Sequence, residues 1–467
     1  MKLTCPLKKI HFIGIGGIGM SAIAEMLLDL GISVQGSDEK ESGNTIRLRK
    51  NGIPVFIGHK AEHIGDADAV VISSAIKSDN PELMEAHKRH LPVGHRSEML
   101  AEILHYKQSI CVSGTHGKTT TSSLIACILM TAGFDPSFVI GGILNSQHSN
   151  ARLGKGDYVV VEADESDGSF LKLPTNLSVV TNIEPEHMDY YHTFENMKGA
   201  YTLFFKNTAF YGACIACIDH PTVREVIDKV DNRRCITYGT VAEADVRAVN
   251  IRLMKGAQVF DVEIRSETGI WQIRDVQLSM IGKHNVLNAL AAISVGIYLG
   301  IGESVIKKAL VSFEGIQRRL TYRGVLNQMP VYDDYGHHPT EIKATLRAVR
   351  ENTKGKVFAV FQPHRYTRLQ DLWDSFLTCF TDADEVYVCD VYGAGETPIE
   401  GITAPAFARM LNKTHGHATY LPFLEDLTGL TERYTSADTL VCLGAGSISA
   451  QINALLESLK GEEKHGV

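Results

Sequence analysis

The sequence lacks a surplus of basic residues. It contains 46 Lys and Arg residues against 54 Asp and Glu residues, which gives a formal net charge of −8. Proteins that bind nucleic acid through its phosphates normally present excess basic charge. The composition therefore argues against a general nucleic-acid binder, and any anionic ligand must be held by local groups.

Long apolar runs are also absent, and none reaches the length that a membrane span requires. Near the amino terminus, Glu25 and Asp29 interrupt the apolar stretch that follows the first lysines, which argues against a signal peptide. The 9 cysteines have no regular spacing, as is typical of a reducing compartment. We therefore expect a cytoplasmic protein without a membrane segment.

One Cys-x-x-Cys pair, Cys214 and Cys217, lies in a run of small and apolar residues. No second ligand pair stands nearby. A buried strand is thus favoured over a redox or metal-binding pair.

The chain is too long for one hydrophobic core, and strand–helix alternation recurs along it. We predict an α/β protein of three domains. These are a Rossmann-like domain over residues 1–105, a central domain with a phosphate-binding loop and a mostly parallel sheet over 106–322, and a Rossmann-like domain over 323–467.

The phosphate-binding loop follows an apolar run that ends at Ser113 and precedes a stretch of helical composition. Such a loop presents backbone N–H groups to an anion, while its lysine adds a positive charge and the next threonine can bind Mg²⁺. Because Val112 stands where the usual first glycine is expected, the loop is shorter than the common form. We interpret it as an ATP site formed by Gly114, Thr115, His116, Gly117, Lys118, Thr119 and Thr120.

Polar residues follow two further predicted strands, at Glu162–Asp167 and at Glu184–Asp189. The carboxyl ends of parallel strands meet at one edge of a sheet, so both segments are expected near the phosphate loop. A carboxylate and an imidazole there suit a divalent metal, with Glu162 and His187 as candidates. A solvated acidic loop is the alternative for residues 162–167.

In the first region, a predicted strand over Lys9–Ile13 leads into a G-x-G-x-x-G loop over Gly14–Gly19, with Asp38 about twenty residues on. This is a dinucleotide-binding pattern. The same loop accepts any diphosphate, so the residues do not distinguish NAD from a UDP-sugar. Ser73 and Ser74 end a later strand, and they either contact the same ligand or form an ordinary turn.

Two later features also leave alternatives open. Asn285 and Asn288, one helical turn apart, either contact an adenine or cap a helix. Dense polar clusters at Asp333–His338 and His364–Arg368 exceed what plain turns need, and they indicate a further site in the last domain.

Taken in order, the motifs resemble the Mur ligase family over residues 14 to 365. They are Gly-x-Gly-Gly-x-Gly-Met, Gly-Thr-His-Gly-Lys-Thr-Thr-Thr, Glu-Ala-Asp-Glu-Ser-Asp, Asn-Ile-Glu-x-x-His-Met-Asp, Gly-x-His-Asn-x-x-Asn-Ala, Asp-Asp-Tyr-Gly-His-His-Pro and Gln-Pro-His-Arg. The resemblance implies that the first glycine loop holds a UDP-sugar and not NAD.

Within the family the chain is similar to the alanine-adding branch. The resemblance implies a ligase that joins L-alanine to UDP-N-acetylmuramate through an acyl phosphate, with ATP converted to ADP and phosphate, in peptidoglycan precursor synthesis. It implies Mg²⁺ or Mn²⁺ as the metal. We expect a monomer or a weak homodimer.

The resemblance also assigns roles to individual residues. Lys118, His116, His187 and Arg365 would be catalytic, and Thr119, Glu162 and His187 would bind the metal. Further ATP contacts would be Asn285, Asn288, Arg319 and Asp334; UDP-sugar contacts would be Gly16, Gly17, Ile18, Gly19, Ser37, Asp38, Ser73 and Ser74; and Tyr335, His337 and Arg365 would line the amino-acid side.

One departure concerns a second metal. Several members of the family carry a carbamoylated lysine some sixteen residues after the histidine, whereas this sequence has Tyr201–Phe204 there, without a lysine. Competing hypotheses are a ligase that adds a recycled peptide, a nicotinamide-dependent oxidoreductase built on Gly14–Gly19, and a non-catalytic nucleotide-binding regulator.

Overall fold

The computed structural model describes residues 7–73, 75–104, 107–147, 149–254, 256–267, 269–430 and 435–465. Ser74, one of the predicted UDP-sugar contacts, lies outside these residues. The chain divides into two compact units, one formed by residues up to 254 with 258–279 and 285–314, the other by 255–257, 280–284 and 315 onward.

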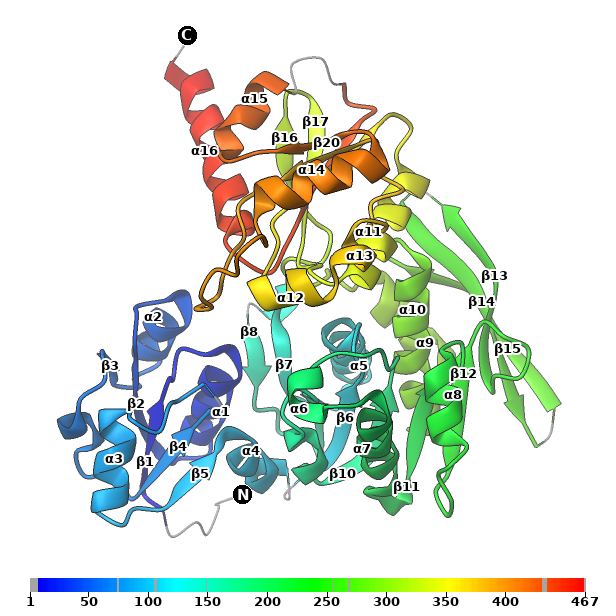
Figure 1. Ribbon diagram of the computed structural model, residues 1–467. Coiled ribbons are helices and arrows are strands. Elements are labelled where there is room, and N and C mark those ends of the chain that lie inside the picture. Colours follow the sequence, from blue (N-terminus) through cyan, green and yellow to red (C-terminus); the bar gives the residue numbers. More distant parts are fainter. Residues whose placement is uncertain are drawn as a thin grey trace. The chain divides into compact units, whose positions relative to one another are not determined.

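The first sheet is an open parallel sheet of five strands in the order β3-β2-β1-β4-β5 (Figure 1). Its strand order reverses direction between β1 and β4, where doubly wound sheets bind ligands. The elements are β1 Lys9–Ile13, α1 Ile18–Asp29, β2 Ser33–Asp38, α2 Gly43–Lys50, β3 Val55–Ile57, the 3₁₀ helix η1 Ala61–Ile64, β4 Ala69–Ile72, α3 Pro81–Lys88, β5 Val93–His95 and α4 Arg96–Leu104. The predicted Rossmann-like architecture is confirmed.

The second sheet has ten strands in the order β15-β14-β13-β12-β11-β10-β6-β9-β7-β8. Strands β7, β9, β6, β10, β11, β12 and β13 pair in parallel, while β8 and β15 run antiparallel to β7 and β14. Its elements are β6 Gln108–Ser113, α5 Lys118–Thr131, β7 Ser137–Leu144, η2 Asn145–Gln147, β8 Ser149–Arg152, β9 Tyr158–Glu162, η3 Ser169–Lys172, β10 Thr175–Val180, α6 Met188–Tyr191, α7 Phe194–Lys206, β11 Thr208–Cys217, α8 Pro221–Ile227, β12 Cys235–Gly239, β13 Val246–Met254, β14 Ala257–Ser266, β15 Gly269–Leu278, α9 Lys283–Tyr298 and α10 Glu303–Val311. The mostly parallel central sheet is as predicted.

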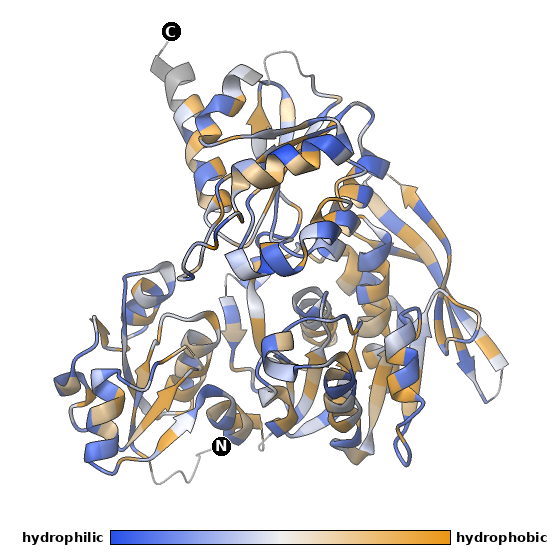
Figure 2. Ribbon diagram, in the orientation of Figure 1, coloured by the Kyte–Doolittle hydropathy of each residue, from blue (hydrophilic) through white to orange (hydrophobic). Residues whose placement is uncertain are grey.

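The central strands of this sheet are continuous apolar runs, which appear orange in Figure 2. Val159, Val160 and Val161 of β9 are all fully buried, because helices cover both faces of a parallel sheet. Cys214 and Cys217 are buried in β11, so the favoured strand is confirmed. Neither belongs to a metal-suited group of side chains in the part of the chain that the structure describes.

A shared hydrophobic core joins the first sheet to the central sheet within the first unit. Residues of β1, α1 and α4 belong to the same buried cluster as residues of β9, η3 and α7, and α1 contacts β7 and β8. The fully buried Tyr201 packs against Phe170, with ring centroids 5.4 Å apart. In the segment where the resemblance would place a lysine, Tyr201 and Phe204 are therefore buried, whereas Leu203 is exposed.

The second unit contains a six-stranded sheet in the order β16-β17-β21-β18-β19-β20, parallel except for β16. Its elements are β16 Thr321–Leu326, β17 Met329–Asp334, α11 Pro339–Asn352, β18 Val357–Phe361, α12 Tyr366–Asp371, α13 Trp373–Phe376, β19 Glu385–Val388, α14 Ala404–His415, β20 Ala418–Tyr420, η4 Leu424–Asp426, α15 Leu427–Leu430, β21 Thr439–Leu443 and α16 Ile448–His465. This is the third open sheet that the sequence predicts. The domain boundaries near 105 and 322 stay a prediction.

Among the described residues, no helix is long and apolar enough to cross a membrane.

We expect Phe361→Ala to destabilise the second unit strongly. Phe361 is fully buried, and its ring lies 5.3–6.2 Å from those of Phe376, Phe380 and Phe407. Truncation leaves a cavity in this core, which costs about 3–5 kcal/mol in the free energy of unfolding. Urea denaturation measures the loss.

The matched control is Phe423→Ala, because Phe423 is 65% exposed. It should change the free energy of unfolding by no more than about 0.5 kcal/mol. Equal losses in both variants would contradict the assignment of Phe361 to the core.

Candidate functional site

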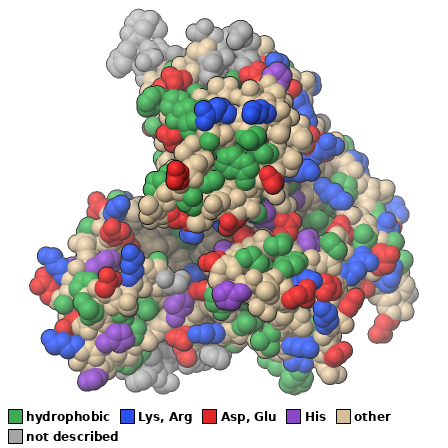
Figure 3. Space-filling view, viewed as in Figure 1, with side chains coloured by type: hydrophobic (Ala, Val, Ile, Leu, Met, Phe, Trp, Pro, Cys, Tyr) green, Lys and Arg blue, Asp and Glu red, His purple; other side chains and the backbone are tan. Residues whose placement is uncertain are grey.

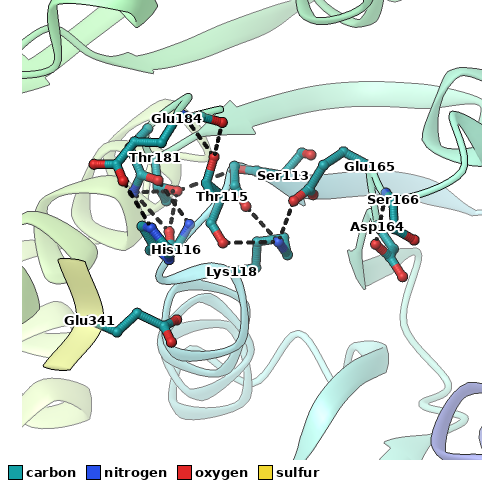
Figure 4. A network of polar contacts seen from close by, with 12 residues as sticks. Ser113, Thr115, His116, Lys118, Asp164, Glu165, Ser166, Thr181, Glu184 and Glu341 are labelled. Carbon is teal, nitrogen blue, oxygen red and sulfur yellow. Dashed lines mark hydrogen bonds and ion pairs between the residues drawn. The ribbon is translucent and has the colours of Figure 1, made fainter. Parts of the chain in front are cut away.

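Two glycines shape the phosphate loop, because side chains do not fit at their positions. Gly114 has φ +132°, and a Cβ there would collide with Thr181 Oγ1. Gly117 has φ +82°, and a Cβ there would lie 2.5 Å from Asn288 Oδ1. The loop therefore packs tightly against the end of β10 and against α9 (Figure 4).

Hydrogen bonds tie the loop to the segment after β10. Thr115 N–H donates to Asn182 O at 3.1 Å, and His116 N–H donates to Asn182 Oδ1 at 2.8 Å. The Thr115 hydroxyl accepts from Glu184 N–H at 2.8 Å. His116 Nε2 lies 3.3 Å from Glu184 Oε2, so the predicted catalytic histidine faces a carboxylate.

Lys118, the first residue of α5, forms a buried ion pair. Its Nζ donates to Glu165 Oε1 at 2.8 Å and to Gly114 O at 2.6 Å (Figure 4). Burial alone would lower the pKa of the Lys118 ammonium, but the carboxylates of Glu165, Asp164 and Glu162 outweigh that effect and raise it above its ordinary value. Lys118 is therefore fully charged at neutral pH.

The carboxylate of this ion pair also belongs to a group of three side chains suited to a cation. Ligand atoms of Glu165, Glu186 and His187 all lie within 4.8 Å of one another. In the described part of the chain, Glu165 Oε2 is buried without a hydrogen-bond partner. Carboxylate oxygens are the ligands that Mg²⁺ prefers, and an orphaned buried oxygen needs a partner, so the donor set fits a divalent metal.

The structure brings His187 into this group, whereas Glu162 is engaged elsewhere. Glu162 Oε2 accepts a hydrogen bond from Gly141 N–H at 2.8 Å. Thr119 and Thr120 are buried in the first turn of α5. The sequence interpretation did not single out Glu165 or Glu186, although both lie in the acidic motifs after β9 and β10.

Asn285 and Asn288 lie beside the phosphate loop. Asn288 Oδ1 accepts from the Thr121 hydroxyl at 3.2 Å, and its Nδ2 donates to Asn285 Oδ1 at 3.2 Å. Their contact with adenine stays a prediction.

Hydrogen bonds to the last residues of β2 hold the glycine loop of the first sheet in its conformation. Gly14 and Ile15 N–H donate to Ser37 O at 2.8 and 2.9 Å, and Gly16 N–H donates to Asp38 Oδ2 at 2.8 Å. Gly17 precedes α1, so Ile18 and Gly19 begin the helix. Ser73 follows β4 and its carbonyl accepts from Ile76 N–H at 3.1 Å, which places it in a turn.

A pocket of about 220 Å³ lies between α1 and the central sheet. Its lining includes Gly19 from the first domain and Glu162, Asp164 and Phe170 from the central region. Arg96, at the start of α4, donates from Nη2 to Asp164 Oδ2 at 3.3 Å. Arg96 therefore brings a positive charge to the pocket, a role that the sequence interpretation missed.

Aromatic and basic side chains gather in the second unit where the sequence predicts an amino-acid site. The His337 ring packs edge-on against Tyr335 and His364, at centroid distances of 5.3 and 5.8 Å. The guanidinium groups of Arg318 and Arg319 lie 4.8 and 5.4 Å from the Tyr335 ring. The sequence-predicted His337 thus lies between Tyr335 and His364, a residue that the sequence singles out only as part of a polar cluster.

Arg365 adopts an unusual backbone conformation for a residue with a side chain. Its φ is +69°, and its N–H donates to Tyr392 O at 2.8 Å. Such strain costs of order 1–3 kcal/mol and tends to occur at functional sites. The conformation supports Arg365 as a site residue.

Asp334 has a structural role in this unit. Its buried carboxylate accepts from Leu320 N–H through Oδ2 and from Gly336 N–H through Oδ1, both at 2.8 Å. Burial raises the pKa of Asp334, and Arg319 acts in the opposite direction. The predicted contacts of Asp334 and Arg319 with ATP stay predictions.

On the face shown in Figure 3, basic and acidic side chains are interspersed. An anionic ligand on this face must therefore be bound by a local group of donors, as the sequence composition indicates.

Comparison with known families covers most of the chain. Residues 9–108 match the model described as Mur ligase family, catalytic domain; residues 112–296 match the Mur ligase middle domain; and residues 318–446 match the Mur ligase glutamate ligase domain. A curated UDP-N-acetylmuramate–L-alanine ligase of Brucella anthropi is 51% identical over 468 residues, covering 99% of this chain and 100% of the relative. The chain belongs to the Mur ligase family.

Two further members of the Mur ligase family also match this chain over nearly its full length. A UDP-N-acetylmuramate–L-alanine ligase of Chelativorans sp. (strain BNC1) is 50% identical, covering 98% of this chain and 100% of the relative. The crystal structure of a UDP-N-acetylmuramate–alanine ligase from Thermotoga maritima is 29% identical, with a TM-score of 0.82, and the match covers 97% of this chain and 99% of that one. The predicted family and three-part α/β fold are confirmed.

We expect the stability of the protein to fall on acidification partly because of His364. Burial, together with the nearby charges of His337, Arg368 and Arg365, lowers the pKa of His364 to about 3. In the unfolded chain a histidine has a pKa of about 6.5. Between these values the unfolded state binds the additional proton, so the free energy of unfolding rises with pH and decreases as pH falls.

Urea denaturation at several pH values between about 4 and 6 measures this slope, and His364→Gln should reduce it by up to about 1.4 kcal/mol per pH unit. His284, whose pKa burial lowers to about 4, contributes in the same direction and remains in the variant. Substituting the exposed His417 by Gln is the control. An unchanged slope in His364→Gln would show that His364 titrates normally.

Proposed function

We propose that this chain is an ATP-dependent amide ligase that joins L-alanine to UDP-N-acetylmuramate, at the cytoplasmic stage of peptidoglycan precursor synthesis. The observation that carries the proposal is the match, at about 50% identity and over nearly the full length, to curated ligases of that name. The phosphate loop with its buried Lys118–Glu165 pair supports it, because such a loop serves phosphoryl transfer.

The chemistry has two steps. The lactyl carboxylate of UDP-N-acetylmuramate attacks the γ-phosphorus of ATP, the bond from that phosphorus to the β–γ bridging oxygen breaks, and an acyl phosphate and ADP form. The amine of L-alanine then attacks the acyl carbon, and phosphate leaves as the amide forms and the amine loses a proton. Activation is necessary because a carboxylate is a poor electrophile. The protein mainly positions the reactants and stabilises charge.

Around the ATP loop, Lys118 stabilises the negative charge of the β- and γ-phosphates. Its raised pKa keeps the ammonium charged throughout the neutral range. Glu165 holds the ammonium at the loop through the 2.8 Å contact. His116, fixed by its hydrogen bonds to Asn182, polarises the reacting groups from the other side of the loop.

The metal would be Mg²⁺, held by His187 with Glu165 and Glu186, which lie together. The resemblance also implies Thr119 and Glu162 as ligands, although Glu162 Oε2 accepts a hydrogen bond from Gly141 N–H. When bound, the metal neutralises phosphate charge as the acyl phosphate forms.

In the second unit, Arg365 would pair with the carboxylate of L-alanine, because a guanidinium binds a carboxylate in a bidentate manner. Tyr335 and His337 would line the same site. In the first domain, the loop Gly16–Gly19 with Ser37, Asp38 and Ser73 would bind the UDP portion of the second substrate.

Phosphate release from MgATP tests the proposed reaction. UDP-N-acetylmuramate and each amino acid are added separately and together. We expect release only when both the UDP-sugar and L-alanine are present. Phosphate release that requires the UDP-sugar but no free amino acid would indicate that the acceptor is a peptide. Turnover of a nicotinamide cofactor without phosphate release would contradict the ligase.

We expect Lys118→Ala to reduce turnover by at least about 10³-fold, because it removes a charge that stabilises the transferring phosphate. Binding of UDP-N-acetylmuramate, measured by calorimetry, should be retained because that ligand is bound by the first domain. Lys308→Ala, at an exposed position of α10, is the matched control. Turnover near that of the control would exclude the assigned role of Lys118.

A further inference from the structure

A buried carboxylate lies beneath the glycine loop of the first sheet, and the roles proposed above do not use it. Glu82, in the first turn of α3, is 0% exposed. Four groups donate to it: Ser37 Oγ at 2.5 Å, His11 Nε2 at 3.0 Å, His63 Nδ1 at 3.0 Å and the backbone N–H of Lys60 at 3.1 Å. A carboxylate has about four lone-pair sites, so Glu82 is saturated.

Glu82 is ionised in this environment. Burial alone would raise the pKa of Glu82, but the hydrogen bonds from His11 and Ser37 outweigh it and lower the pKa to about 2. An ionised carboxylate only accepts hydrogen bonds. The single hydroxyl proton of Ser37 therefore points toward Glu82.

This direction determines the tautomer of His59, the residue that follows β3 and Gly58. His59 Nδ1 lies 3.0 Å from Ser37 Oγ. Because the Ser37 proton is already directed to Glu82, Ser37 must accept this hydrogen bond, and His59 must carry a proton on Nδ1. In the neutral ring Nε2 is then unprotonated and is an acceptor.

His59 presents this acceptor beside the predicted nucleotide site. β2 and β3 are neighbours and pair in parallel, so His59 lies at the same edge as Ser37 and Asp38. Its side chain is 21% exposed. Across the described residues, Nε2 forms no hydrogen bond within the protein.

We propose that His59 Nε2 accepts a hydrogen bond from the N3–H of the uracil ring of a uridine diphosphate, and that Ser37 and Glu82 fix the tautomer that permits it. The inference rests on the proposed function in taking a uridine diphosphate as the ligand of the glycine loop. His59 is then a specificity-determining residue, because N3 of cytosine carries no proton and places a lone pair against Nε2. Glu82 and Ser37 are positioning residues.

Calorimetric titration of the full chain with UDP, CDP and 2′-deoxy-UDP tests the proposal. The wild-type protein should bind UDP at least about tenfold more tightly than CDP, since an unpaired acceptor facing another lone pair costs about 1–3 kcal/mol. His59→Ala should bind the two nucleotides within about threefold of each other. His59→Asn should do the same, while its amide N–H replaces Nδ1–H as a donor to Ser37 and preserves the fold.

Glu82→Gln tests the positioning role. The amide keeps the size of the carboxylate but has one acceptor oxygen and two donor hydrogens, so it no longer directs the Ser37 proton. The preference for UDP over CDP should decrease at least about threefold, while ATP affinity stays at the wild-type value. His87→Ala, exposed on α3, is the matched control and should keep the full preference.

Each contrary outcome has a separate meaning. Wild-type preference retained in His59→Ala or His59→Asn would overturn the proposal. A loss of affinity for 2′-deoxy-UDP that disappears in His59→Ala would assign Nε2 to the ribose, which also overturns it. If the wild-type protein bound none of the nucleotides, the proposed UDP-sugar ligand would fail instead.

Discussion

The buried ion pair between Lys118 and Glu165 depends on strand order, and the phosphate site depends on the ion pair. β6 lies between β9 and β10, so the loop after β6 meets the acidic segments that follow both neighbours. Burying a lone charge costs several kcal/mol, and only a close partner offsets this. The Nζ–Oε1 contact of 2.8 Å therefore anchors the ammonium where phosphate charge must be stabilised. A different strand order would leave both charges unpaired.

The glycine loop of the first sheet is built differently from the phosphate loop. The N–H groups of Gly14, Ile15 and Gly16 donate to Ser37 O and Asp38 Oδ2, and no lysine follows the loop. Its shape depends on Ser37, whose carbonyl accepts from Gly14 and Ile15 and whose hydroxyl is held by Glu82. Glu82 is a buried anion, and three histidines and a backbone N–H surround it. These groups offset the negative charge of Glu82, and the network fixes the direction of the Ser37 proton.

Local patterns were enough to predict much of this structure. The strand–loop–helix context of Gly14–Gly19 and of Gly114–Lys118 follows from short-range spacing, and so does the buried strand that contains Cys214 and Cys217. Glu165 could not be chosen over Glu162 by spacing, because both belong to one acidic run. The backbone turn after β9 decides that Glu165 reaches Lys118 while Glu162 faces Gly141. Likewise, Ser37 and Glu82 are 45 residues apart, and only the tertiary fold joins them.

The charges that this chain places around the phosphate loop indicate that a cation binds there. Glu165, Asp164 and Glu162 all act on the Lys118 ammonium, and Glu186 lies beside Glu165. Three carboxylates thus act on one lysine, and Arg96 is paired to one of them, Asp164. A nucleoside triphosphate adds further negative charge, and repulsion between like charges is strong where water is excluded. The orphaned Oε2 of Glu165 lies where a divalent ion would reverse this repulsion. Glu165 and Glu186, which would otherwise oppose phosphate binding, would then be ligands of that ion.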